Sequence, residues 1–307
     1  MVRFLKVVLG VVAFLAVAGG GAWLWLTARE EVPLETDYQI VLDELRRLGG
    51  SVPGAKPLAI YSELVAKTSL PRAAVFAGES FAPHPMVHQV FQVRYEDGFV
   101  LLDAAFPQAM LEQMGGGEYN PAAYVQVQTA LAGAQQVFFT HEHFDHLAGV
   151  GTHRAPAELG PRLRLTREQL GNAKALEEAK LPAALRDAVQ PLDFERVHAA
   201  APGFVVQKAP GHTPGTILAY VQLRDGVEYL FLGDVAWDLD QITKGHYRPR
   251  LVTDFFLHED RKAVLAQFRA LSELMRANPQ LVVVVSHDVD QREDLIASGL
   301  LKEGFDF

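Results

Sequence analysis

Histidine and acidic side chains are concentrated in the stretch Thr140-His141-Glu142-His143-Phe144-Asp145-His146. Five of the six side chains from His141 to His146 can bind a metal ion or tune one, and the apolar run at 137–139 is typical of a buried strand. Histidines and acids packed this densely have no use in a core, because buried charge is costly unless it is paired or bound to metal. The stretch therefore predicts a metal-binding loop at the end of a strand, with zinc, iron or manganese as suitable ions.

Three later positions offer matching ligands, and each follows or ends a short apolar segment. They are His212 in Pro210-Gly211-His212-Thr213-Pro214-Gly215, Asp234 in Leu232-Gly233-Asp234, and His287 in Val285-Ser286-His287-Asp288. His212 lies too far from His146 in the chain to share a helix with it. The fold must therefore bring these ligands together.

With these residues the chain resembles the metallo-β-lactamase-fold hydrolases. The pattern His141-x-His143-x-Asp145-His146 is similar to the signature of that family, and the three later positions match its remaining ligands. The resemblance covers roughly Val87 to His287. It implies an α/β fold, an αββα four-layer sandwich in which two sheets pack face to face with helices outside and the metals at one edge.

The resemblance also implies a division of the ligands between two Zn2+ ions, for which iron or manganese are possible substitutes. Two groups of three ligands and one bridging ligand are expected: His141, His143 and His212; Asp145, His146 and His287; and Asp234. A hydroxide between the two ions would attack a carbonyl carbon, and Asp145 would orient it and pass a proton to the leaving group. Asp145 and Asp234 are thus the predicted catalytic residues, and Asp103, at the end of a strand, is a candidate support for the metal loop.

The residues that match the family pattern, and those that depart from it, narrow the class of reaction. Redox di-iron members usually carry Glu at the place of His143, so His143 favours hydrolysis. The chain has no cysteine, which excludes disulfides and the cysteine-containing β-lactamases. Three-histidine β-lactamases typically lack the bridging acid, so Asp234 favours a di-zinc hydrolase of an ester, lactone or thioester. The alternatives are an exported β-lactam hydrolase and a non-catalytic metal-binding scaffold.

The loop that follows Asp234 is the expected substrate loop. Homoserine-lactonase-like members often place Tyr three positions after the bridging acid, where this chain has Trp237, and an indole N–H can donate one hydrogen bond but cannot act as an acid. A solvated basic loop is the alternative interpretation. The net charge of −9 argues against a nucleic-acid partner. The residues expected to contact a small-molecule substrate are Trp237, Lys244, His246, Tyr247 and Arg248.

The N-terminus predicts a membrane anchor or a signal peptide. Arg3 and Lys6 precede an almost uncharged run from Val7 to Leu26, which is long enough to cross a bilayer as a helix. Trp23 and Trp25 lie near its far end, where aromatic residues favour the membrane interface. Small residues at 16–18 fit a cleavage site as well. Both interpretations place the catalytic domain outside the cytoplasm, either membrane-anchored or secreted into the periplasm or medium.

Three parts of the chain are expected: 1–29 as anchor or signal segment, 30–57 as a linker with a helix at 38–48, and 58–307 as the hydrolase domain. Strands are predicted at 87–95, 99–102, 137–139, 163–165, 204–207, 217–222, 227–232 and 281–285. Helices are predicted at 120–131, 166–180, 183–189 and 260–278. Asp97-Gly98 is expected to form a hairpin turn with positive φ at the glycine.

Overall fold

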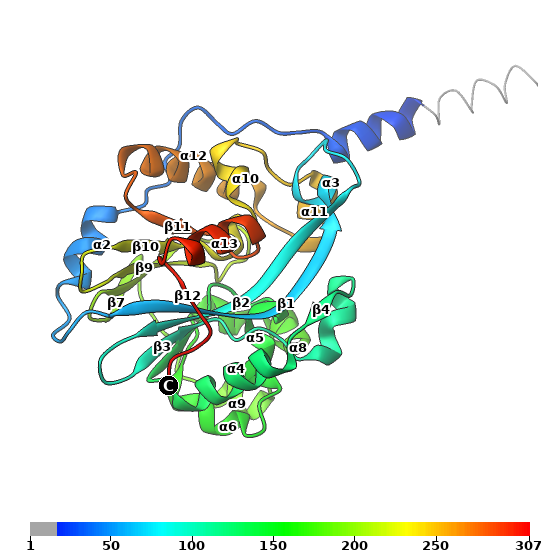
Figure 1. Ribbon diagram of the computed structural model, residues 1–307. Helices are drawn as coiled ribbons and strands as arrows, with labels where there is room; N and C mark the ends of the chain where they lie inside the picture. Colours follow the sequence, from blue (N-terminus) through cyan, green and yellow to red (C-terminus); the bar gives the residue numbers. More distant parts are fainter. Residues whose placement is uncertain (1–16) are drawn as a thin grey trace, which may run out of the picture.

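The computed structural model describes residues 17–307 and contains two β-sheets that lie one over the other (Figure 1). The first sheet has the strand order β12-β1-β2-β3-β5-β6, with β4 paired to β1, and the second has the order β11-β10-β9-β8-β7. The strands are β1 Ala59–Pro71, β2 Pro83–Arg94, β3 Phe99–Leu102, β4 Glu118–Tyr119, β5 Gln136–Phe138, β6 Leu163–Arg164, β7 Val197–Ala201, β8 Phe204–Lys208, β9 Ile217–Gln222, β10 Glu228–Phe231, β11 Val282–Val284 and β12 Lys302–Glu303.

Helices cover the outer faces of both sheets, so the expected αββα sandwich is confirmed. Helices α4, α5, α6, α8 and α9 pack on the first sheet, and α2, α10 and α12 pack on the second. The helices are α2 Leu42–Gly49, α3 Arg72–Val75, α4 Pro121–Gly133, α5 Phe144–Gly151, α6 Pro156–Leu159, α7 Arg167–Gly171, α8 Ala173–Glu178, α9 Ala183–Ala188, α10 Leu239–Thr243, α11 Arg250–Val252, α12 Arg261–Ala277 and α13 Val289–Ala297, with short turns η1 Gln108–Met114, η2 Gly160–Arg162, η3 Gly233–Val235 and η4 Thr253–Leu257.

Each short strand contributes to two layers of core, because neighbouring side chains in a strand point to opposite faces. In β3, Leu101 packs against the helices of the first sheet, whereas Val100 and Leu102 face the second sheet. Phe138 and Phe204 meet between the sheets with their ring centroids 5.0 Å apart. Burying a side chain of this size contributes about 1.5–3 kcal/mol to the stability of the fold. Because side chains on both faces of each strand are buried, short strands still give a large core.

Several predicted elements differ from the observed ones. The prediction of a single helix at 166–180 is wrong, because the helix breaks at Asn172 into α7 and α8. The Asn172 side-chain oxygen accepts a hydrogen bond from the Ala175 N–H, and its amide group donates one of 2.9 Å to Glu142 Oε1. The turn at Asp97-Gly98 joins β2 to β3, but Gly98 does not have the expected positive φ. A Cβ atom at 98 would lie 2.5 Å from the Gln135 amide nitrogen, so a larger residue there would displace the Gln135 side chain.

The N-terminal part of the chain contains a projecting helix and, after it, a segment that packs on the domain. Residues 7–16 of the predicted anchor lie outside the described residues, as does the first position of the predicted cleavage site at 16–18. Residues 17–27 form a helix that projects from one corner of the body (Figure 1). Within residues 17–307, no helix has both the length and the apolar character needed to cross a bilayer. Leu42 and Leu45 of α2 pack on the second sheet, so the predicted linker 30–57 runs along the domain surface.

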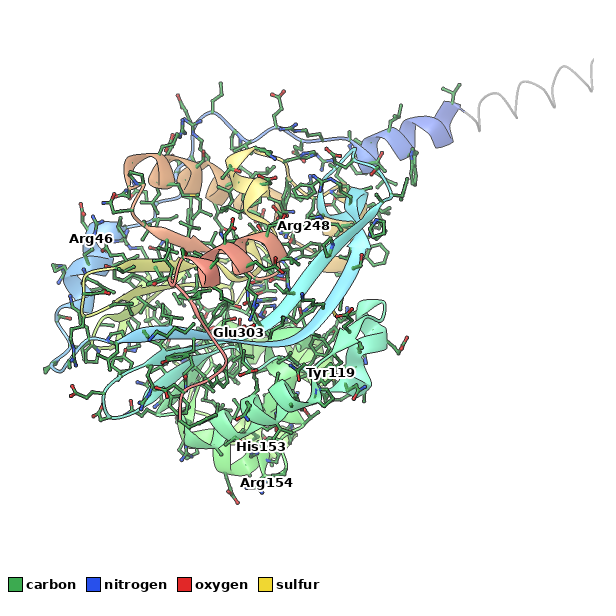
Figure 2. All side chains as sticks on the ribbon, viewed as in Figure 1. Arg46, Tyr119, His153, Arg154, Arg248 and Glu303 are labelled. Carbon is green, nitrogen blue, oxygen red and sulfur yellow. The ribbon has the colours of Figure 1, made fainter. Side chains whose placement is uncertain are left out.

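A half-buried ion pair fixes α2 on the second sheet and gives a pH-dependent contribution to stability. Arg46, labelled in Figure 2, donates two hydrogen bonds of 2.8 Å to the Glu228 carboxylate, and the Tyr220 hydroxyl also bonds to it. The hydrogen bonds from Arg46 lower the pKa of Glu228, although burial alone raises it. A carboxyl group whose pKa is lowered on folding stabilises the fold above its unfolded pKa and loses this effect as the pH falls through its folded pKa.

Glu228→Gln is therefore expected to lower the free energy of unfolding at pH 7 by about 1–2 kcal/mol. This expected loss is smaller than for a fully buried pair, because a third of the Arg46 side chain is exposed and solvent screens its charge. The difference from the wild type should shrink as the pH falls below the ordinary value of 4.5. Urea unfolding at several pH values measures it. A difference of the same size at pH 7 and at low pH would contradict a role for the Glu228 charge.

Candidate metal centre

The predicted metal ligands all come from loops at one edge of the two sheets. His141 and His143 follow β5, and His146 lies in the first turn of α5. His212 lies between β8 and β9, and Asp234 lies in the turn η3 just after β10. His287 follows β11, the neighbour of β10 in the second sheet. The structure therefore brings together residues that span almost 150 positions of sequence, as the fold required.

Three histidines form the first group of possible ligands. His143 Nδ1 lies 3.1 Å from His141 Nε2 and 3.1 Å from His212 Nε2, and the three atoms lie within 4.8 Å of one another. Zinc bound to imidazole nitrogen at about 2.0–2.1 Å in a tetrahedral site separates its ligand atoms by roughly 3.3 Å. The spacing of these nitrogens therefore suits one zinc-sized ion.

Two acids and two histidines form the second group, again with ligand atoms within 4.8 Å: Asp145, His146, Asp234 and His287. Asp145 Oδ2 lies 3.4 Å from His146 Nε2 and 3.7 Å from His287 Nε2. Asp234 Oδ1 lies 3.3 Å from His146 Nε2 and 3.1 Å from His287 Nε2. This group offers mixed nitrogen and carboxylate oxygen donors, which suit zinc, iron or manganese.

Asp234 faces both groups. Its Oδ1 atom lies in the second group. Its Oδ2 atom lies 3.6 Å from His212 Nε2 and 3.8 Å from His141 Nε2 in the first group, and 3.3 Å from His287 Nε2 in the second. Gly233, just before it, has a φ of 54°, and a Cβ atom there would lie 2.6 Å from the Thr140 side chain. Glycine at 233 therefore lets the turn come close to the metal loop and places Asp234 between the two groups.

Outer contacts orient four of the five histidines so that Nε2 faces the centre. In each, the other ring nitrogen has a partner: Thr140 Oγ1 at 3.1 Å for His141, Asp103 Oδ2 at 2.9 Å for His146, Glu259 Oε1 at 2.6 Å for His212, and the Val87 carbonyl oxygen at 2.7 Å for His287. Such contacts fix the tautomer and ring orientation of metal-binding histidines.

The lowered pKa values of His141 and His143 fit ligands of a metal ion, whereas the pKa of His146 reflects the negative charge around it. Burial, together with His212, lowers the pKa of His143 to about 4, and burial lowers the pKa of His141 well below its ordinary value. Burial alone would lower the pKa of His146, but Asp145, Asp103 and Asp234 raise it well above the ordinary value. Among the described residues, His146 Nε2 and Asp234 Oδ1 are buried without a hydrogen-bond partner. A divalent cation would satisfy both atoms.

Asp103 supports the metal loop, as the sequence suggested. The Thr140 N–H donates to Asp103 Oδ1 at 2.7 Å, while Asp103 Oδ2 lies 2.9 Å from His146 Nδ1. Asp103 has a φ of 70°, and Ala105 two residues later has a φ of 52°. Non-glycine residues in this left-handed region store strain, which is common where a backbone positions functional groups.

Glu142 points away from the centre, as expected from its place between two ligands. Its Oε2 atom accepts a hydrogen bond of 2.7 Å from Thr213 Oγ1, and its Oε1 atom accepts from Asn172. Thr213 follows His212 directly. Glu142 therefore connects the loop of His141 and His143 to the loop of His212, and the break between α7 and α8 supplies its second partner.

Glu259 is a functional candidate that the sequence did not indicate. Its side chain is wholly buried and bonds to three residues: His212, Arg248 at 2.7 Å, and the Tyr247 hydroxyl. His88 is a second such residue, because its Nδ1 atom lies 3.5 Å from Asp145 Oδ2. Both contacts join segments far apart in the chain, and neither residue belongs to a motif that could have indicated it.

The five predicted substrate residues take different positions. Trp237 lies at the centre, and His246 Nε2 lies 2.7 Å from the Ala77 carbonyl oxygen. Lys244 is exposed and pairs with Asp240 at 2.6 Å. The side chains of Tyr247 and Arg248 are wholly buried against Glu259. The basic loop is thus partly internal, and substrate contact for these five residues stays a prediction.

Trp237 contacts Asp234, the acid that is predicted to bridge. Its indole N–H donates to Asp234 Oδ2 at 2.7 Å, and its ring packs on the Arg248 guanidinium, 4.5 Å from the ring centroid. Trp237→Phe keeps an aromatic ring but removes the donor. Because outer hydrogen bonds of metal ligands typically contribute 10–100-fold to metal affinity or activity, a loss of roughly tenfold is expected. Titration with a competing chelator measures the metal affinity, and an unchanged affinity and rate would show that this hydrogen bond has no role.

Comparison with known proteins agrees with this geometry. A family model described as the metallo-beta-lactamase superfamily matches residues 85–287. No curated protein matches the chain in sequence. Among solved structures, a quorum-quenching N-acyl homoserine lactone lactonase is 15% identical, with a TM-score of 0.62, covering 79% of this chain and 97% of that one.

Two further solved structures share the fold. An N-acyl homoserine lactone hydrolase with N-hexanoyl-L-homoserine bound at its catalytic metal center is 14% identical, with a TM-score of 0.62, covering 78% of this chain and 96% of that one. A dizinc quorum-quenching lactonase in complex with a product is 13% identical, with a TM-score of 0.56, covering 78% of this chain and 92% of that one.

The sandwich and the buried histidine–aspartate centre at its edge define a metal-dependent hydrolase. The chain belongs to the metallo-β-lactamase superfamily, whose members bind divalent metal ions, usually zinc.

Proposed function

We propose that the chain is a dinuclear zinc hydrolase that cleaves an ester, lactone or thioester bond. The observation that carries this proposal is the position of Asp234, whose carboxylate lies between the two groups, 3.3 Å from His146 Nε2 in one and 3.6 Å from His212 Nε2 in the other. A carboxylate placed in this way can join two ions, which a site for one ion does not need. The three lactone-hydrolysing structures that share the fold support a carbonyl substrate of this kind.

Bound metal ions and the side chains of the protein would supply different parts of the chemistry. When bound, divalent ions supply Lewis acidity, which polarises a carbonyl oxygen and makes water acidic enough to act as a nucleophile at neutral pH. Burial raises the pKa of Asp145, but His146 and His88 hold it well below its ordinary value, so Asp145 stays ionised. An ionised Asp145 can accept a hydrogen bond from the attacking water and deliver a proton to the leaving group.

Attachment to a membrane through residues 7–26 is part of this proposal, with the catalytic domain outside the cytoplasm. The sequence run, the preceding Arg3 and Lys6, and the two tryptophans at its end support it. A cleaved signal peptide is the alternative form of the same export.

A substrate panel with the zinc-loaded full-length chain tests the reaction class. The panel holds short- and long-chain lactones, an acyl-glutathione thioester, aryl esters and nitrocefin, with Asp145→Ala as the control. We expect turnover of one class of carbonyl substrate and a loss of at least roughly a hundredfold in Asp145→Ala, because even outer partners of metal ligands contribute 10–100-fold. Turnover of nitrocefin alone would identify a β-lactam hydrolase, and bound zinc without any turnover would favour a scaffold.

A further inference from the structure

Exposed aromatic side chains gather at one corner of the molecule. Among the described residues, six aromatic side chains are strongly exposed, and five of them come from three segments at this corner. The exposed fractions are 72% for Phe81, 58% for Phe255 and 73% for Phe256, with 51% and 55% for the two tryptophans. The aromatic corner is defined by these five residues: Trp23, Trp25, Phe81, Phe255 and Phe256.

Contacts between the three segments hold the corner together. The Arg250 guanidinium of α11 lies 5.0 Å from the centroid of the Trp25 ring. The Ala77 N–H, just after α3, donates to the Tyr247 carbonyl oxygen at 3.0 Å. Figure 1 shows the helical segment 17–27 leaving the body beside α3 and α11. The five aromatic side chains therefore belong to one region of surface.

A polar clamp fixes the N-terminal helix to this region. The Glu30 carboxylate accepts hydrogen bonds of 2.8 Å from Arg250 and 2.7 Å from Arg261, and the Arg29 guanidinium donates to the Lys244 carbonyl oxygen at 2.8 Å. The clamp sets the direction in which residues 17–27 leave the body. A bilayer that receives the apolar run 7–26 must then lie on the side of the aromatic corner.

We propose that the aromatic corner docks the catalytic domain onto a lipid bilayer. The inference rests on the proposed membrane attachment of residues 7–26, whose apolar sequence continues directly into the corner. Tryptophan and phenylalanine are side chains that enter the interface between headgroups and acyl chains. The acids Glu79 and Asp254 beside the corner lie 3.5 Å from Arg72 and 3.9 Å from Arg250, so their charges are compensated at an anionic surface.

Docking in this orientation would place lipid next to the Trp237 side of the metal centre. Leu257, which follows Phe255 and Phe256, packs with Val252 against the cluster of Phe76 and Trp237. Glu259, the partner of His212, lies two residues further along the chain. The segment that carries the exposed phenylalanines therefore also carries the contacts that orient the centre.

The absence of cysteine allows a direct test in the full-length chain. Phe256→Cys and Phe81→Cys each give one labelling site for an environment-sensitive fluorophore, and Arg154→Cys is the control, because Arg154 is exposed and Figure 2 shows it far from the N-terminal helix. The labelled chains are reconstituted in phosphatidylcholine–phosphatidylglycerol vesicles with or without a doxyl-labelled lipid. We expect quenching of roughly twofold or more at 81 and 256 and none at 154.

Co-flotation of the full-length chain with the same vesicles reports the attachment separately. If the chain floats with the vesicles but the labels at 81 and 256 stay in water, the attachment holds and the docking is wrong. The emission shift at 81 or 256 could instead rise with protein density and stay the same with or without the doxyl lipid. This result would mean that a second copy of the chain covers the corner, which also overturns the proposal.

A further variant separates docking from mere proximity to the anchor. In Phe255→Ser/Phe256→Ser, the label at 81 should lose roughly half or more of its quenching, because two apolar side chains no longer enter the interface. Unchanged quenching would show that the anchor alone brings position 81 near lipid. Neither measurement depends on hydrolysis, so failure of the docking is distinct from failure of the proposed reaction.

Discussion

Asp234→Asn is expected to lower kcat/KM by at least roughly a hundredfold and to reduce the bound metal from two ions per chain to one. Outer partners of metal ligands already contribute 10–100-fold, so loss of a ligand shared by two ions should exceed that range. Asparagine keeps the shape of the side chain, and its oxygen can still accept the hydrogen bond from Trp237. The loss would therefore report the missing charge and the missing second metal-binding oxygen.

Elemental analysis of the purified chain measures the metal content, and initial rates on the substrate of the wild type measure kcat/KM. Asp240→Asn is the matched control, because it removes one carboxylate from the same loop at an exposed position paired with Lys244. This control should keep both ions and the wild-type rate. Two ions and a wild-type rate in Asp234→Asn would show that Asp234 does not bridge, and the dinuclear proposal would fail.

The metal centre could be predicted from the sequence because its ligands lie in local patterns. His141, His143, Asp145 and His146 occupy one loop, and the other three ligands each end an apolar segment. Asp103 was predictable for a similar reason, since it ends the strand β3 beside β5. Strand ends gather at one edge of a sheet, so a residue's place relative to its strand was sufficient to locate it.

The outer contacts of the centre could not be predicted in this way. Glu259 stands next to Asp260, the N-cap of α12, and no feature of the sequence distinguishes the buried acid from the exposed one. Arg248 was expected to contact the substrate or to lie in a solvated loop, because arginine is rarely fully buried without a partner. The packing of α12 against the loop after β10 supplies that partner, and packing between distant segments leaves no periodic pattern.

The long strand β1 has no counterpart among the predicted elements for a related reason. Its sequence includes Glu63 and Lys67, and acids and lysine are depleted in strands. Pairing with β2 along almost its whole length overrides this preference. On the β12 side of β1, Glu63 accepts a hydrogen bond of 3.1 Å from the Phe305 N–H, so the charged residue has a role that only the folded chain defines.

Glu259→Gln is expected to cause a large loss of stability. The Glu259 carboxylate is wholly buried and is the ion-pair partner of Arg248, whose Nε and Nη1 atoms have no hydrogen-bond partner among the described residues. Removing one member of a buried pair leaves the other charge uncompensated, which typically costs about 3–5 kcal/mol. Urea unfolding of the chelator-treated chain measures this loss without the contribution of bound metal.

The same variant should also weaken the first group of ligands. Glu259 Oε1 lies 2.6 Å from His212 Nδ1, and a glutamine at this place carries no charge to hold the ring. A loss of roughly 10–100-fold in affinity for the first ion is expected, as for other carboxylate–histidine contacts. Competition with a chelator at a temperature well below the unfolding transition measures this affinity in the folded population.

The double variant Arg248→Met/Glu259→Gln separates the two effects. Replacing both members of a buried ion pair by uncharged groups is often close to neutral, so most of the stability lost in Glu259→Gln should return. The metal affinity should not return, because His212 still lacks its carboxylate partner. If the double variant recovers the metal affinity together with the stability, then Glu259 acts through Arg248 and the fold alone. Recovery of stability without recovery of affinity would establish Glu259 as the residue that orients His212.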